Sequence, residues 1–251
     1  MEHLLRATSR AEARHFWFRG FRAFVTPLLR RAADRTRDGG VPRLLDCGCG
    51  TGANLTLLNR FGRAYGFDLS PTGLRIARQS GRALTARASV DAAPFPAGAF
   101  DVVTSFDVLY SLDDRTERAA IAEMYRLLKP GGFAVVNVAA MEVLRGDHSV
   151  LSHEIRRYSK ADLRHRLEAA GFVVRRLTYT NASLFLPMLA ARTWQRRRGL
   201  KQEDQAEQEI AVPAEPINAL LSGVLLLESL WLRWFDAPAG SSLLCLAEKL
   251  R

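Results

Sequence analysis

The spacing of hydrophobic and polar residues divides the chain into a central region and two flanking ones. Near the N-terminus, apolar residues recur about every three to four positions between arginines, as in residues 21–29, which is typical of amphipathic helices. From Arg43 on, short apolar runs alternate with helical patterns. This alternation predicts a parallel sheet with helices on both faces.

The boundaries of the predicted elements follow from these patterns and from local signals. Ser70 followed by Pro71 marks a helix start, because serine caps a helix and proline suits its first position. Helices are expected at Gly52–Arg60, Pro71–Gln79, Arg115–Leu128 and Lys160–Ala170. We expect a doubly wound, mostly parallel α/β sheet of seven strands at Arg43–Cys47, Arg63–Phe67, Ala83–Ala88, Phe100–Ser105, Phe133–Val138, Phe172–Thr178 and Ser242–Ala247.

Both ends depart from this rhythm and suggest a division into four segments. Residues 1–40 are expected to form a helical cap, residues 41–180 the core, residues 181–240 a helical insertion, and residues 241–251 the last strand of the core. The insertion reads as a basic helix over Asn181–Leu200 kinked at Pro187, a polar, mobile stretch over Lys201–Glu209 and an apolar helix over Ile217–Phe235.

The apolar helix of the insertion has three possible environments. It is shorter than the ~20 apolar residues that span a bilayer and is interrupted by Glu228 and Arg233. We expect its apolar face to pack against that of the preceding helix and to wall an acceptor pocket. An interfacial membrane helix and a dimer seam are the alternatives.

A glycine-rich turn follows the first strand of the core. Asp46-Cys47-Gly48-Cys49-Gly50-Thr51-Gly52 leads from that strand into a helix, and glycine lets the backbone turn tightly against a ligand. Asp68 ends the next strand, where a carboxylate can accept both ribose hydroxyls of an adenosine. An adenosine cofactor is therefore expected. The glycines and Ala53 also fit a dinucleotide fingerprint, so their spacing leaves the cofactor open.

Four motifs in order resemble the class I S-adenosylmethionine-dependent methyltransferases. They are Asp46–Gly52, Gly66–Ser70, Pro94–Pro96 leading into Phe100–Val103, and Leu127–Gly132, and the resemblance covers residues 42–179. It implies a Rossmann-like fold, methyltransferase activity, and S-adenosyl-L-methionine as cofactor with S-adenosyl-L-homocysteine as product. Residues 14–20 and 156–159 look like a subgroup often found near surface-polysaccharide genes.

The resemblance also implies a set of cofactor contacts. Asp46 would lie near the cofactor's amino group, and Asp68 would hold the ribose. Ser89 stands where many relatives carry an acid facing the adenine, and a hydroxyl accepts that hydrogen bond less strongly. The expected cofactor-binding residues are Asp46, Gly48, Cys49, Gly50, Gly52, Asn54, Asp68, Leu69, Ser89, Val90 and Phe106.

Polar residues after the strand at Phe133–Val138 supply candidates for catalysis. His148, His153 and Tyr158 lie near the expected opening, where a base would remove the proton of a hydroxyl acceptor. Ordinary loop polarity and helix capping are the alternative explanation. No metal is expected, because Cys47 and Cys49 have no nearby His/Cys pair to complete a four-ligand zinc site.

Composition limits the class of protein. The 251 residues carry 36 Lys and Arg against 26 Asp and Glu, a net charge of +10 that is compatible with RNA, anionic lipid or acidic small molecules. Three cysteines cannot form a disulfide framework, and the N-terminus lacks a signal-peptide pattern. We therefore expect a cytoplasmic protein.

Methyl transfer to oxygen or nitrogen of a small or lipid- or glycan-linked acceptor is the expected function. An RNA methyltransferase using the basic surface and a non-catalytic interaction protein on the same fold are the alternatives. The Asn/Asp-Pro-Pro-aromatic motif of many base-nitrogen methylases is absent, with Ser105–Val108 in its place, so no nucleic-acid partner is expected. The glycine turn and Asp68 argue against a non-catalytic protein. Peripheral membrane contact stays open, and the oligomeric state is not predicted.

Overall fold

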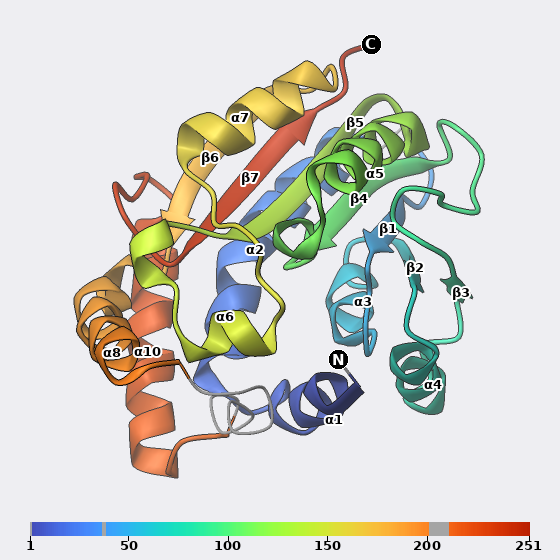
Figure 1. Cartoon of the computed structure of the whole chain (residues 1–251). Helices are drawn as coiled ribbons and strands as arrows, with labels where there is room; N and C mark the ends of the chain where they lie inside the picture. The colour runs from blue at the N-terminus through green and yellow to red at the C-terminus, as the bar shows by residue number, and fades with distance from the viewer. Residues whose placement is uncertain (1, 37–38, 201–210) are drawn as a thin grey trace.

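The fold is built on one mixed sheet. A computed structural model describes residues 2–36, 39–200 and 211–251, without side-chain detail for residues 2–4, 6 and 7. The sheet order is β3-β2-β1-β4-β5-β7-β6 (Figure 1). Strands β1 to β5 pair in parallel, and β7 runs antiparallel to its neighbours β5 and β6. The strands are β1 (Arg43–Cys47), β2 (Arg63–Asp68), β3 (Thr85–Arg87), β4 (Phe100–Phe106), β5 (Leu128–Ala139), β6 (Val173–Thr180) and β7 (Ser242–Glu248).

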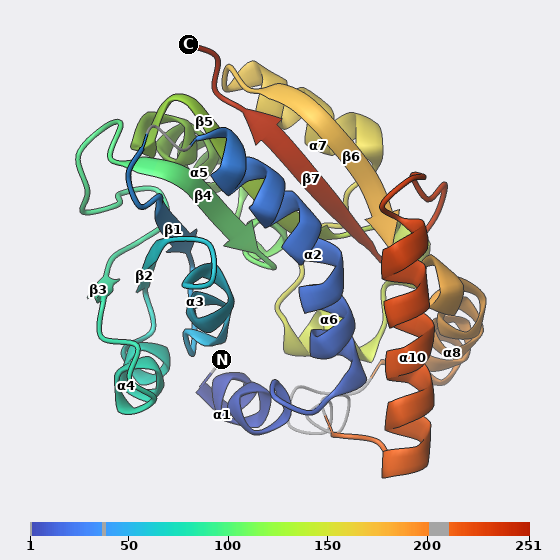
Figure 2. The same cartoon turned by 180° about the vertical axis from the view of Figure 1, so that it is seen from behind.

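Helices cover both faces of this sheet, so the predicted doubly wound, mostly parallel α/β fold is confirmed. Helices α5 and α7 pack on one face, and α2 and α3 pack on the other (Figures 1 and 2). The described helices are α1 (Glu2–Ala11), α2 (Phe16–Arg35), α3 (Ala53–Leu58), α4 (Pro71–Gln79), α5 (Asp114–Leu127), α6 (Asp147–Leu151), α7 (Lys160–Ala169), α8 (Phe185–Arg198) and α10 (Glu215–Trp231), with short 3₁₀ turns at Leu109–Ser111, Glu142–Leu144 and Ala182–Leu184.

Local capping explains why several helices begin where the sequence predicts. The Ser70 hydroxyl accepts the Gly73 N–H, so α4 begins at Pro71 as expected. The Asp113 carboxylate accepts the Thr116 N–H and starts α5 one residue before the predicted Arg115. These contacts lie within one turn of the chain, which is why residue order alone locates them.

Helix α2 is the longest element on its face of the sheet and brings α10 beside it. A Cβ atom on Gly20 would come within 2.5 Å of the Leu225 side chain, so only glycine lets the two helices approach this closely. The helices lie side by side in Figure 2. Helix α2 therefore bridges the sheet and the last helical segment.

The insertion differs from the prediction in two respects. Pro187 lies in the first turn of α8, where a missing N–H costs no helical hydrogen bond, so it does not kink a longer helix. Helix α10 packs on α2 instead of burying its apolar face against α8, because Leu225 on its inner side meets Gly20. The stretch Lys201–Glu209, predicted to be mobile, lies outside the described residues.

Candidate active site

The glycine-rich turn after β1 is a tight, well-anchored structure. Gly48, Gly50 and Gly52 all have positive φ angles, of 79°, 51° and 74°, in the region that favours glycine. The N–H groups of Gly48 and Cys49 both donate to the Phe67 carbonyl, each at 2.9 Å. The end of β2 therefore fixes the turn.

Asp68 connects that turn with the start of α4. Its Oδ2 accepts the Gly50 N–H at 2.7 Å, and its Oδ1 accepts the Ser70 N–H at 2.7 Å. Each carboxylate oxygen has a second lone pair, so both oxygens can still accept a ribose hydroxyl. Leu69 is 63% exposed, so its apolar side chain is accessible to the adenine ring of a cofactor. This arrangement is compatible with the predicted ribose contact.

Asp46 is a buried carboxyl group beneath the same turn. Its Oδ1 accepts the Thr104 hydroxyl at 2.6 Å, and its Oδ2 has no hydrogen-bond partner among the described residues. Burial raises the pKa of Asp46 to about 7, although the bond from Thr104 lowers it. A cationic group bound at the turn would give Oδ2 a partner, so this carboxyl fits the ammonium end of the cofactor.

The other predicted cofactor residues differ in their surroundings. The Ser89 hydroxyl donates a hydrogen bond to the Asp91 carboxylate. A carboxylate therefore lies beside the expected adenine contact, where the sequence predicted only the serine. Phe106 is buried against the ring of Phe21 in α2, with centroids 5.0 Å apart. Cys49 is buried, while Asn54 in the first turn of α3 and Val90 after β3 are half-buried. These assignments stay predictions.

Helix α1 lies close to the glycine-rich turn. The Thr51 hydroxyl donates to the Glu12 carboxylate at 2.8 Å, just beyond the end of α1. Arg82 donates to the Thr51 carbonyl at 3.0 Å. A Cβ atom on Gly50 would stand only 3.5 Å from the Leu5 side chain. Figure 1 shows α1 near α3 and α4, so the N-terminal segment covers this side of the candidate cofactor site.

A cavity of about 430 Å³ opens beyond the carboxyl end of β4. Its wall comes from α1, the aromatic segment His15–Phe18, the turn after β4, the loop after β5, α8 and the start of β7. Val108, which follows the wall residue Asp107, lies against the glycine turn, because a Cβ atom on Gly48 would meet its side chain at 2.5 Å. The candidate cofactor site and the cavity are therefore neighbours.

Asp107 is the acid in that wall nearest to β4. It has a positive φ of 60°, an uncommon conformation for this residue type. Asn137 holds it twice: its carbonyl accepts the Asp107 N–H at 3.0 Å, and its side-chain amide donates to Oδ1 at 2.9 Å. The Asp107 side chain is exposed toward the cavity, and desolvation by the protein around it raises its pKa to about 7, although the bond from Asn137 and the charge of Arg157 lower it. A carboxyl with that pKa can exchange a proton near neutral pH.

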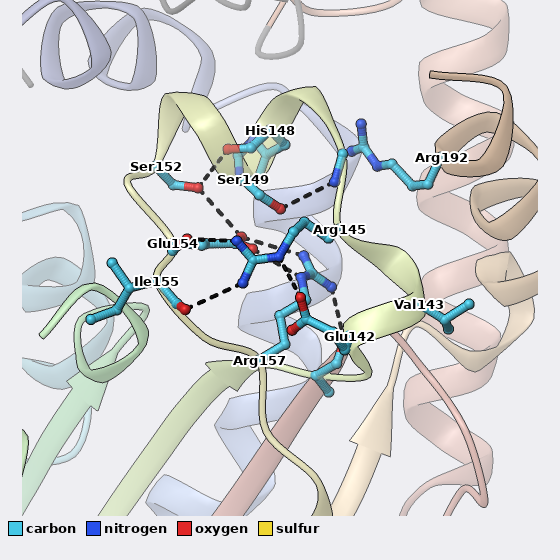
Figure 3. A network of polar contacts seen from close by, with 12 residues as sticks. Glu142, Val143, Arg145, His148, Ser149, Ser152, Glu154, Ile155, Arg157 and Arg192 are labelled. Atoms are coloured by element: carbon cyan, nitrogen blue, oxygen red, sulfur yellow. Dashed lines mark hydrogen bonds and ion pairs between the residues drawn. The ribbon is translucent and has the colours of Figure 1, made fainter. Parts of the chain in front are cut away.

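The loop after β5 supplies a polar wall opposite Asp107. Arg157 donates to Glu154 at 2.9 and 3.3 Å and to the Ala140 carbonyl at 2.8 Å, as Figure 3 shows for the Glu154 pair. Burial raises the pKa of Glu154, but the Arg157 guanidinium, a hydrogen bond with Ser149 and the charge of His148 together lower it by more, so it lies below its usual value. Glu154 therefore stays ionised, and its charge adds to the elevation of the Asp107 pKa.

The three predicted catalytic residues separate in the structure. His148 lines the cavity, whereas His153 and Tyr158 are absent from its wall. The Tyr158 hydroxyl is buried and donates to Glu117 at 2.5 Å, and Glu117 also accepts Arg156 at 2.7 Å and Arg166 at 2.6 Å. Burial and the bond to Glu117 raise the pKa of Tyr158 well above its usual value. Tyr158 as a base at the cavity is therefore wrong: it is a buried donor to a charge cluster.

Two other residues of the cavity wall have no catalytic role predicted from the sequence. His15 caps α2, and its Nδ1 accepts the Trp17 N–H at 3.1 Å, so it serves the aromatic segment structurally. Asp107 was not assigned a role, although an acid directly after a central strand of a parallel sheet lies where ligands of such sheets bind. That position was the available signal for it.

Comparison with known proteins identifies the class to which this site belongs. A family model described as a methyltransferase domain matches residues 45–136. Demethylmenaquinone methyltransferase of Thermus thermophilus is 37% identical over 115 residues, which cover 43% of this chain and 51% of that protein. Malonyl-[acyl-carrier protein] O-methyltransferase of Serratia marcescens is 35% identical over 100 residues, covering 39% and 38%. The matches thus span about half of the first relative and less of the second.

The fold comparison extends over the whole chain. The crystal structure of an S-adenosylmethionine-dependent methyltransferase from Thermotoga maritima superposes with a TM-score of 0.59 at 18% identity, covering 99% of this chain and 100% of that one. The fold and the glycine turn define a Rossmann-like adenosine-binding domain. More specifically, the chain has the Rossmann-like fold of S-adenosylmethionine-dependent methyltransferases, and its residues 45–136 match a methyltransferase domain. Its cofactor is S-adenosyl-L-methionine, and the product form is S-adenosyl-L-homocysteine.

Proposed function

We propose that this protein transfers a methyl group to an oxygen or nitrogen atom of a small or lipid-linked acceptor bound in the 430 Å³ cavity. The observation that carries the proposal is Asp107, a carboxyl group with a pKa of about 7 that opens into the cavity beside the glycine turn. Asp46 and Asp68 would hold the ammonium and ribose groups of the cofactor.

When bound, S-adenosyl-L-methionine would supply an electrophilic methyl group and leave as S-adenosyl-L-homocysteine as its sulfur–methyl bond breaks. The acceptor's O–H or N–H bond breaks as the new bond to carbon forms, and Asp107 accepts the released proton to become a carboxylic acid. Asn137 keeps the Asp107 carboxylate in place through its amide donor. The aromatic segment His15–Phe18 lines the cavity and would shield the reacting atoms from water on that side.

The lining of the cavity favours an acceptor that is mainly apolar with one polar end. Phe16, Trp17, Leu184 and Met188 supply apolar and aromatic surface. Ser241 Oγ is buried in the wall without a hydrogen-bond partner among the described residues, so it can bond a polar group of the acceptor. The names of the two curated relatives, demethylmenaquinone and malonyl-[acyl-carrier protein] methyltransferases, also point to lipid-related or carrier-linked acceptors.

Transfer of radiolabelled methyl from S-adenosyl-L-methionine to a panel of acceptors tests this function. The panel comprises a demethylated quinol, malonyl-acyl carrier protein, a polyprenyl-linked sugar and a transfer-RNA pool. We expect product with one of the first three and a kcat reduced by ~100-fold or more in Asp107→Asn, since general bases contribute that much. Asp34→Asn, an exposed acid on α2, is the matched control. Methylation of RNA alone, or full turnover in Asp107→Asn, would overturn the proposal.

A further inference from the structure

Helix α10 has an inverted distribution of polar and apolar residues. A surface helix usually turns apolar residues inward and polar residues outward. In α10 the buried residues are Asn218, Ser222, Leu225, Glu228 and Ser229, of which four are polar. The exposed large residues of α10 are Ile217, Leu220, Leu226, Leu227, Leu230 and Trp231, with Trp234 and Phe235 just beyond it, and we call these eight residues the outer face.

Polar contacts on the inner side fix this orientation. Asn218 accepts the Phe16 N–H at 2.8 Å and donates to the Arg14 carbonyl at 3.1 Å. Ten residues later, Glu228 accepts the N–H groups of Ala182 and Ser183, each at 2.9 Å. Rotating α10 to bury its leucines would break all four bonds and leave a carboxylate without partners. The outward position of the apolar residues is therefore built into the fold.

The outer face gathers nearly half of the exposed large apolar side chains of the described residues on one helix and the turn after it. It holds eight of the eighteen large apolar side chains that stand exposed in the described part of the chain. Leu220, Leu227 and Trp234 are 67%, 69% and 83% exposed, and they recur at helical spacing. Trp231 stacks on Phe235 with ring centroids 5.5 Å apart. A contiguous apolar stripe of this kind marks an interaction surface.

An arginine stands at each end of the stripe. Arg14 contacts the first turn of α10 through its carbonyl, and Arg233 follows the last turn. Both are exposed, and neither forms an ion pair within the described ranges. Three acids lie nearby: Glu228 is turned inward, Asp236 pairs with Arg176 at 2.9 Å, and Glu215 in the first turn of α10 is exposed and accepts the Asn218 side-chain amide at 3.3 Å. The whole chain carries +10.

We propose that the outer face of α10 docks flat on an anionic lipid bilayer. Leucines and tryptophans would enter the boundary between headgroups and acyl chains, and Arg14 and Arg233 would meet lipid phosphates at the two ends. Within the described residues, no helix has the length and apolarity needed to cross a membrane, so α10 would lie in the plane of the surface. A second copy of the chain fits less well, because two such faces would bring like-charged ends together.

Vesicle co-sedimentation of the full chain tests this surface. We expect binding to vesicles of equal parts phosphatidylcholine and phosphatidylglycerol, weaker binding to phosphatidylcholine alone, and weakening with added salt. The variant Leu220→Gln/Leu227→Gln should bind the anionic vesicles roughly tenfold or more weakly, because each leucine contributes burial energy. Val41→Gln/Leu250→Gln, which changes two exposed apolar residues outside the outer face, should bind as the unaltered protein does.

The measurement separates this surface from the methyl-transfer site. Both double variants should keep the melting temperature and the affinity for S-adenosyl-L-homocysteine of the unaltered protein, because every substituted side chain is exposed and lies outside the cavity. Undiminished vesicle binding by Leu220→Gln/Leu227→Gln would overturn the proposal. So would a dimer in sedimentation that this variant abolishes, since the outer face would then be a dimer interface.

Discussion

Thr51, in the glycine-rich turn, donates a hydrogen bond of 2.8 Å to Glu12, which follows α1 and lies 39 positions earlier in the chain. Both side chains are buried. Burial raises the pKa of Glu12, while the bond from Thr51 and the charges of Arg82 and Arg22 lower it. This contact fastens the N-terminal segment to the turn that would hold the cofactor's methionine end.

Loss of the Thr51 hydroxyl should therefore weaken cofactor binding. We expect Thr51→Ala to reduce the affinity for S-adenosyl-L-homocysteine by about 1–2 kcal/mol, because one buried hydrogen bond to a carboxyl group is lost and α1 opens more readily. Thr51→Ser, which keeps the hydroxyl, is the control. Calorimetry measures the affinity, and hydrogen exchange measures the protection of α1. Unchanged affinity and protection in Thr51→Ala would contradict the role of this contact.

Asp46 should make cofactor binding depend on pH. Its pKa is about 7 in the ligand-free protein, and an ammonium group bound beside it favours the ionised carboxylate. Below about pH 7, binding must therefore release a proton, and the affinity for S-adenosyl-L-homocysteine should fall with falling pH. Calorimetry in two buffers of different ionisation enthalpy detects the proton. Asp46→Asn should remove both effects, and an affinity of the unaltered protein that is flat between about pH 6 and 8 would refute the assignment.

The same carboxyl should influence folding stability in the opposite sense. Its pKa is raised on folding from 3.8 to about 7, so between these values the folded protein binds more protons than the unfolded chain. The contribution of Asp46 to the free energy of unfolding therefore falls as pH rises through this window. In urea unfolding without ligand, the difference in unfolding free energy between Asp46→Asn and the unaltered protein should favour the variant more at pH 8 than at pH 5. If the difference instead favoured the variant more at pH 5, Asp46 would be ionised and stabilised by a partner within the ligand-free protein.

Asp68 should contribute to cofactor affinity both directly and through the turn that it holds. Asp68→Ala removes the acceptor for the Gly50 and Ser70 N–H groups as well as the expected ribose contact. We expect ~1–3 kcal/mol weaker binding of S-adenosyl-L-homocysteine. Adenosine, which shares the ribose, should weaken in parallel, whereas Asp34→Ala should alter neither. Calorimetric affinities of Asp68→Ala equal to those of Asp34→Ala would contradict the assignment.

Tyr158 should matter for stability and not for turnover. Tyr158→Phe removes one buried hydrogen bond to Glu117, so the free energy of unfolding should fall by about 1–2 kcal/mol. Glu117→Ala should cost more, about 3–5 kcal/mol, because Arg156 and Arg166 lose a fully buried partner. Urea unfolding measures both changes. A kcat that falls in Tyr158→Phe while KM and stability stay constant would restore Tyr158 as a catalytic candidate.

Residue order alone determined the features that depend on neighbours in the chain. The strand Arg43–Cys47 and the helix Pro71–Gln79 have the predicted bounds, because strand patterning and the Ser70 cap are local. The glycine turn was equally readable, since its positive φ angles favour glycine whatever surrounds them. Together with Asp68 at the end of the next strand, it predicted an adenosine cofactor.

Only the tertiary structure decided which side chains meet across long stretches of chain. Tyr158 and Glu117 are 41 positions apart, and their contact turned an expected base into a buried donor. The proposed role of Asp107 depends on Asn137 on the neighbouring strand and on a cavity that several segments line. The outward leucines of α10 have the same origin: helical periodicity shows that two faces differ, but Asn218 and Glu228 found their partners on distant segments, and those bonds determine which face meets the solvent.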